Sequence, residues 1–103
     1  MGLNVHIGDR HYQFDGPHTN TGSLLKQSGV YVISTIVNGY HKVLDVGESH
    51  DIRHRIENHD RKQAWQRHIS DTLYVSALYC NAVDRMLVES AIRQFHNPPC
   101  GIR

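Results

Sequence analysis

The sequence predicts one small domain of the α/β class, in its α+β form, in which helices flank an antiparallel sheet. Two apolar runs, 30–37 and 41–46, are rich in β-branched residues, and the Asn38-Gly39 pair between them is a strong hairpin signal. After Gly47, apolar residues recur at the spacing of a helix. With 103 residues, of which 39% are hydrophobic, the chain can bury one core but not two.

The N-terminal residues 1–28 are expected to form an accessory arm of a small β-hairpin and a linker. Apolar and polar residues alternate over 5–14, and Gly8-Asp9 interrupts the alternation as a turn would. Residues 16–22 have the composition of a loop. Residues 29–103 would then form the main domain.

The length of the turn in the main hairpin decides which side chains share a face of the sheet. With a two-residue turn at Asn38-Gly39 and no irregularity, Tyr31 opposes Val46, and Tyr31 and Asp45 lie on opposite faces. A three-residue turn, or one β-bulge, places Tyr31 and Asp45 on the same face. The sequence leaves both arrangements open.

A helix is expected directly after the hairpin. Asp51 can cap its N-terminus, because an aspartate side chain accepts hydrogen bonds from the first free amides of a helix. Ile52, Ile56 and His59 recur at i, i+4 and i+7. The same spacing places Arg55 and His59 one turn apart.

Three further elements complete the predicted domain: a helical stretch over 63–68, a third strand over 73–78 and a final helix over about 83–95. Asn81 can cap the final helix, and Pro98-Pro99 ends it because proline cannot continue the helical hydrogen bonds. We expect the final helix to pack into the core through Val83, Met86, Leu87, Val88, Ala91, Ile92 and Phe95. Its other side carries Arg85, Glu89 and Arg93.

Composition restricts the partners of the chain. Eleven basic and ten acidic residues give a formal charge of +1, so any nucleic-acid footprint must be small or local. The nine histidines are scattered, which does not favour a structural zinc site. No apolar run approaches the roughly 18 residues of a membrane span, and no signal peptide is recognisable. We therefore expect no membrane partner and a cytoplasmic protein in which Cys80 and Cys100 are reduced.

Four features occur in an order and spacing that resemble the GIY-YIG nuclease domain: Gly29-Val30-Tyr31, Asp45-Val46-Gly47, Arg55 and Glu89. The resemblance covers roughly residues 29–101. It implies a three-stranded antiparallel sheet with flanking helices. It also implies hydrolysis of phosphodiester bonds with one divalent cation, Mg²⁺ or Mn²⁺, and nucleic acid as partner, with DNA as the expected substrate.

The resemblance assigns roles to four residues. Tyr31 takes the place of a tyrosine that helps to activate the attacking water, although a phenol with an ordinary pKa of about 10 is a weak base. The Arg55 guanidinium can hold two phosphate oxygens as negative charge develops. His59 could relay a proton or hold a phosphate. Glu89 matches the carboxylate that binds the metal ion.

Ordinary structural roles remain open for the same side chains. Tyr31 can simply pack against the sheet, and Arg55 can pair with Asp51 on the helix surface. Glu89 can pair with the arginines that lie one turn away on either side.

Three positions depart from the family pattern: Asp45 replaces the tyrosine of the second motif, Glu48 stands where some relatives have lysine, and Gly101 stands where an asparagine often completes the site. Asp45 could bind metal, serve as a stronger base, or mark the loss of hydrolysis. We therefore keep two hypotheses. One is a metal-dependent DNA endonuclease, and the other is a catalytically weakened domain that binds nucleic acid or a protein partner without cleaving. A homodimer remains open, because isolated nuclease domains usually borrow recognition from another module or copy.

Overall fold

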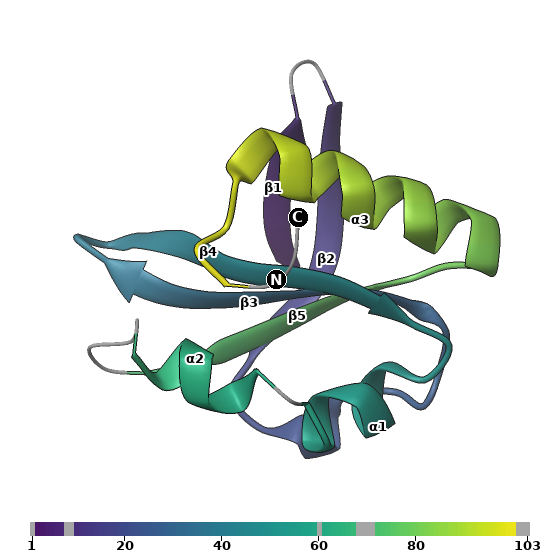
Figure 1. The fold of residues 1–103 in the computed structure, drawn as a ribbon, viewed down its shortest axis with the longest axis horizontal. Coiled ribbons are helices and arrows are strands. Elements are labelled where there is room, and N and C mark those ends of the chain that lie inside the picture. The colour runs from purple at the N-terminus through teal and green to yellow at the C-terminus, as the bar shows by residue number, and fades with distance from the viewer. Residues whose placement is uncertain (1, 8–9, 60, 68–71, 101–103) are drawn as a thin grey trace.

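The computed structural model describes residues 2–7, 10–59, 61–67 and 72–100 (Figure 1). The elements of this part of the chain are β1 (Gly2–Ile7), β2 (Arg10–His18), η1 (Thr21–Ser23), β3 (Gly29–Val37), β4 (Tyr40–Ser49), α1 (Ile52–Glu57), α2 (Lys62–Gln66), β5 (Tyr74–Tyr79) and α3 (Ala82–His96).

The strands form one antiparallel sheet in the order β1-β2-β5-β3-β4. The α+β class is confirmed, but within the described ranges the sheet has five strands instead of the expected three. β3, β4 and β5 are the predicted strands, and the N-terminal hairpin adds two more because β2 pairs with β5. β2 also extends to His18, into the predicted loop. The turn expected at Gly8-Asp9 lies outside the described residues.

The turn between β3 and β4 has two residues, as its sequence indicates. Asn38 and Gly39 both have positive φ angles, 52° and 83°, which is the backbone that a tight twisted hairpin turn of type I′ requires. Val37 therefore pairs directly with Tyr40.

A β-bulge in the same hairpin settles which residues share a face. Ile33 pairs with Asp45, but the next residue of β3 pairs with Val43, so Leu44 is an extra residue on β4. Downstream of the bulge every β4 side chain is shifted by one position. Tyr31 and Asp45 consequently lie on the same face of the sheet.

Helices cover both faces of the sheet, with α3 on one side and α1 and α2 on the other (Figure 1). The core on the α1–α2 side contains Leu24, Tyr31, Ile33, Leu44, Ile52, Ile56, Trp65, Val75, Ala77 and Cys100. The core on the α3 side contains Phe14, Val30, Val32, Val46, Val88 and Ile92. Among the described helices, none has both the length and the apolar composition that a membrane crossing requires.

The predicted helix starts are confirmed. The Asp51 side chain accepts a hydrogen bond from the His54 amide, and the Asn81 side chain accepts one from the Asp84 amide. The predicted continuation of the first helix through His59 is wrong, because α1 ends at Glu57. The second helix is shorter than expected, and the end predicted for it at residue 68 is not among the described residues.

The predicted core stripe of α3 is mostly wrong. Val88 and Ile92 are buried as expected, but four of the other apolar residues of the stripe are exposed: Val83, Met86, Leu87 and Phe95. Arg93, expected on the outer side, is buried instead. The helix is turned so that this arginine reaches polar partners at the edge of the sheet.

Candidate active site at the edge of the sheet

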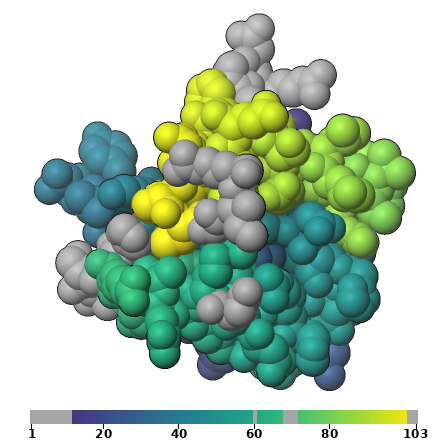
Figure 2. All heavy atoms as spheres, in the orientation of Figure 1, coloured from purple at the N-terminus to yellow at the C-terminus, as the bar shows by residue number. Residues whose placement is uncertain are grey.

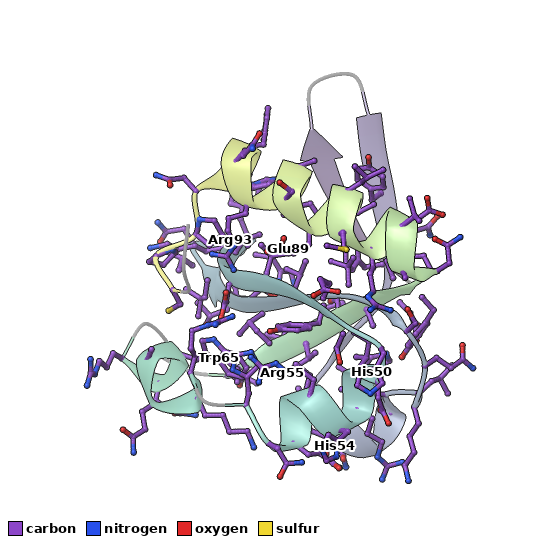
Figure 3. The ribbon with its side chains drawn as sticks, turned by 45° about the vertical axis from the view of Figure 1, so that its right-hand side comes forward. His50, His54, Arg55, Trp65, Glu89 and Arg93 are labelled. Atoms are coloured by element: carbon purple, nitrogen blue, oxygen red, sulfur yellow. The ribbon has the colours of Figure 1, made fainter. Side chains whose placement is uncertain are left out.

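An open concavity of about 240 Å³ lies beside β4, the edge strand of the sheet. Figure 3 shows Glu89 and Arg93 on α3 on one side of the β3–β4 ribbon and Arg55 on α1 on the other. In the space-filling view, α3 and the α1–α2 layer form adjacent parts of the same molecular face (Figure 2). The concavity is lined by Tyr31, Val46, Gly47, Glu48, Arg55, Arg61, Glu89 and Arg93.

Three of the four residues singled out in the sequence line this concavity, namely Tyr31, Arg55 and Glu89. His59 is buried and contacts the Tyr31 hydroxyl from behind. The lining is polar, with three arginines and two glutamates around one phenol. Such a surface suits an anion whose charge the guanidinium groups can share.

Gly47 allows Tyr31 to reach the concavity. The two residues face each other across the β3–β4 ladder, and a Cβ atom on Gly47 would overlap the hydroxyl and ring of Tyr31. The phenol ring therefore crosses over β4 at the one position without a side chain. Gly29 serves a related purpose, because a Cβ atom there would overlap the Leu78 carbonyl of the neighbouring strand.

Tyr31 is almost fully buried. Its hydroxyl is hydrogen bonded to Nε2 of His59, and the charge of Arg55 lies nearby. Burial raises the pKa of Tyr31 to about 12; the positive charges of Arg61 and Arg55 oppose this rise, and the negative charge of Asp45 adds to it. Tyr31 is therefore a neutral phenol near neutral pH, and its role as a base stays a prediction.

His59 is fixed from three directions. The Arg61 backbone N–H donates to its Nδ1 atom at 3.0 Å. Its ring packs against Trp65, with the ring centroids 4.4 Å apart, and stands edge-on to Tyr31 at 5.4 Å. These contacts place His59 beside the phenol, and it is not among the described residues that line the concavity.

Asp45 is the centre of the largest polar network in the described chain. The Arg61 Nε and Trp65 Nε1 atoms each donate to Oδ2 at 2.8 Å, and the Arg93 Nη2 atom donates to Oδ1 at 2.7 Å. The Val46 amide also donates to Oδ1. Both oxygens of this buried carboxylate are engaged, so its geometry suits the holding of arginines more than metal binding or proton transfer.

Arg61 and Trp65 are parts of the site that the sequence did not predict, and Arg93 was expected on the outside of its helix. The signal that could have found them is Asp45 itself. An aspartate in an apolar strand must be paired when it is buried, which calls for cationic or N–H partners elsewhere in the chain. The sequence spacing does not tell which arginines these are.

Glu89 is partly engaged. Its Oε2 atom accepts a hydrogen bond from Arg93 Nε at 3.1 Å, and its side chain is 23% exposed. Arg85, the other arginine considered as a partner of Glu89, donates instead to Glu48 at 2.6 Å and to Ser28 at 2.8 Å. Of the two salt bridges considered for Glu89, the one with Arg93 is present.

Glu89 and Glu48 are the carboxylates that line this concavity, and each is already paired with an arginine, Glu89 with Arg93 and Glu48 with Arg85. Within the described ranges, no group of three or more histidine, cysteine, aspartate or glutamate residues is arranged to hold a metal. Magnesium sites often use one or two carboxylates and are completed by water and substrate phosphate. The donor set therefore fits a magnesium ion that binds together with a phosphate.

Comparisons of the chain with models of known protein families, with curated proteins and with solved structures found no match.

The Asp45 network predicts a large stability effect for Asp45→Asn. The substitution removes the charge that two guanidinium groups share, and breaking a buried ion pair typically costs at least about 3 kcal/mol of unfolding free energy. Urea denaturation measures this loss. Glu48→Gln is the control, because its pair with Arg85 is partly exposed and should be worth no more than about 1 kcal/mol. Equal losses in the two variants would contradict the central role of Asp45.

The contact between Gly47 and Tyr31 predicts a coupling that a double-mutant cycle can measure. Gly47→Ala should cost about 1–3 kcal/mol of unfolding free energy, because the new methyl group displaces the phenol ring. In a Tyr31→Ala background the same substitution should cost much less, since no ring remains to be displaced. An unchanged cost in both backgrounds would show that Gly47 is needed for another reason.

Proposed function

We propose that this protein is a metal-dependent DNA endonuclease of the GIY-YIG type, which hydrolyses phosphodiester bonds. The observation that carries the proposal is the meeting of Arg55 from α1 and Glu89 from α3 in one concavity with the Tyr31 hydroxyl. These groups come from distant parts of the chain and from opposite faces of the sheet, and they converge at its edge.

The arginines suit the electrostatic demand of phosphodiester hydrolysis, in which negative charge grows on the oxygens around phosphorus. Arg61 and Arg93 are oriented by Asp45, so their guanidinium groups are held in place before a substrate arrives. Arg55 lines the same concavity, and its positive charge lies beside the Tyr31 phenol. A preorganised set of donors of this kind stabilises a transition state without a cost of reorganisation.

Glu89 would hold one divalent cation, Mg²⁺ or Mn²⁺, with Glu48 near enough to contribute to the same concavity. When bound, such a cation polarises the scissile phosphate. Arg93 donates to the Glu89 carboxylate and therefore competes with a cation for it. We expect binding of the cation to be weak in the absence of a phosphate and stronger in its presence.

Nucleic acid, with DNA as the expected form, is the partner in this proposal. The formal charge of +1 limits the number of phosphates that one copy can neutralise, so a homodimer that joins two footprints is compatible with the proposal. We also propose a cytoplasmic location, in which the free thiols Cys80 and Cys100 stay reduced.

The alternative function is a catalytically weakened domain that binds nucleic acid or a protein partner through the same concavity without cleaving. Two observations favour it: Glu89 is already paired with Arg93, and the Asp45 that replaces the second motif's tyrosine is occupied by two arginines. In this case Arg55 would contribute to binding and not to a reaction.

The endonuclease proposal predicts that Glu89→Gln and Arg55→Lys each reduce DNA cleavage by roughly 100-fold or more, because each removes a group that acts on the phosphate. Cleavage of duplex, single-stranded and branched DNA is measured with Mg²⁺ and with Mn²⁺. The matched controls are Glu57→Gln and Arg53→Lys, which alter an exposed pair on α1 and should leave the rate unchanged. Thermal melting verifies that all variants are folded. Wild-type rates in Glu89→Gln or Arg55→Lys would refute the assigned roles.

The alternative predicts a different pattern for the same protein. With either cation, wild-type protein leaves all three DNA forms intact, yet Arg55→Ala weakens DNA association about tenfold while Arg53→Ala does not. Fluorescence anisotropy with labelled DNA measures the association. Cation-dependent cleavage that is lost in Glu89→Gln would exclude this function.

A further inference from the structure

We propose that His59 donates its Nε2 proton to Tyr31, so that the Tyr31 hydroxyl acts in the site as a hydrogen-bond donor to phosphate and not as a base. The first half of this proposal concerns the fold alone. The second half rests on the proposed function.

The protonation of His59 follows from its backbone neighbour. The Arg61 amide N–H points at the Nδ1 atom of His59 at 3.0 Å, and a backbone amide can only donate. Nδ1 must therefore carry a lone pair. A neutral imidazole has one N–H group, so the proton lies on Nε2. In a doubly protonated ring, the N–H group at Nδ1 would face the N–H group of the Arg61 amide, and this hydrogen bond would be lost.

The direction of the next hydrogen bond follows from the first. Nε2 of His59 contacts the Tyr31 hydroxyl oxygen, and with its proton it donates to that oxygen. The opposite direction would leave His59 without a proton on either nitrogen, which is an anionic imidazole. His59 is therefore a positioning residue that holds the phenol and cannot accept a proton from it in this arrangement.

Because the Tyr31 oxygen accepts this hydrogen bond from His59, its own proton must point away from Nε2. Tyr31 lines the concavity, where the positive charge of Arg55 lies beside the phenol. A phosphate oxygen bound beside Arg55 would receive this proton as a hydrogen bond. Burial supports this behaviour, because it raises the pKa of Tyr31 to about 12 and keeps the phenol neutral.

Asp45 stabilises the same arrangement from a distance. Its Oδ2 atom accepts hydrogen bonds from the Trp65 indole and from the Arg61 side chain. The Trp65 ring packs on His59, and the Arg61 amide fixes Nδ1. The residue that replaces a phenol in the second motif thus helps to orient the phenol of the first.

The tautomer of His59 is tested directly by long-range proton–nitrogen NMR on the full chain with isotope-labelled histidine. The expected result is a neutral ring with a protonated Nε2 and an unprotonated Nδ1. Tyr31→Phe should leave this tautomer unchanged, because Nδ1 still faces the Arg61 amide. A neutral ring protonated on Nδ1 would overturn the proposal. This measurement needs no cleavage, so it stands apart from failure of the proposed function.

The role of Tyr31 is tested by the pH dependence of cleavage in wild type and Tyr31→Phe. If the phenol only donates a hydrogen bond, Tyr31→Phe should lower the cleavage rate by roughly 10²–10³-fold. This factor should be the same at every pH at which the fold is intact. The groups that face this phenol, Arg55, His59, Arg61 and Asp45, are the same in both proteins. Parallel pH profiles support the proposal. A pH dependence that disappears in Tyr31→Phe would identify Tyr31 as the base and overturn it.

His59 variants separate positioning from packing. The amide nitrogen of His59→Gln can replace Nε2 as a donor, whereas the carboxylate of His59→Glu can only accept. We expect His59→Gln to keep cleavage within about tenfold of wild type and His59→Glu to fall to the level of Tyr31→Phe. Equal rates in the two His59 variants would overturn the role of the Nε2 proton, and thermal melting establishes that both are folded.

Discussion

The site depends on the pairing of the buried Asp45 carboxylate with Arg61 and Arg93. This carboxylate lies on the face of the sheet covered by α1 and α2, yet it binds Arg93 from α3, which covers the opposite face. Arg93 reaches it around β4, the edge strand, and also donates to the carbonyls of Val46 and Cys100. The Cys100 amide in turn donates to Leu44, the extra residue of the bulge. The two helical layers and the segment after α3 are thereby joined at one edge, and the concavity lies where they meet.

The same network explains how a nearly neutral chain can hold several arginines at one site. Three arginines line the concavity, and Asp45 together with the two lining glutamates carries an equal number of negative charges. The site is therefore a set of oriented guanidinium groups and not a region of net positive charge. This arrangement favours binding through a few well-placed contacts over binding through a broad basic surface.

Local features of the fold could be predicted from the sequence, and contacts between distant segments could not. The Asn38-Gly39 turn and the caps Asp51 and Asn81 depend on residues a few positions away, so their side chains and backbone preferences were sufficient. The orientation of α3 was predicted wrongly because the helix has apolar residues on both sides, and the need of Arg93 to reach Asp45 decides between them.

The candidate site shows the same division. Arg55 and Glu89 were selected by the order of motifs, and nothing in their spacing alone places them in one concavity. There is a clear physical reason for glycine at positions 29 and 47, because at each position another group occupies the space that a side chain would need. The buried carboxylate of Asp45 also has a clear role, because it binds two of the arginines that line the concavity. The two glycines are thus required by steric fit, whereas the buried charge of Asp45 is stable only while its arginine partners are present.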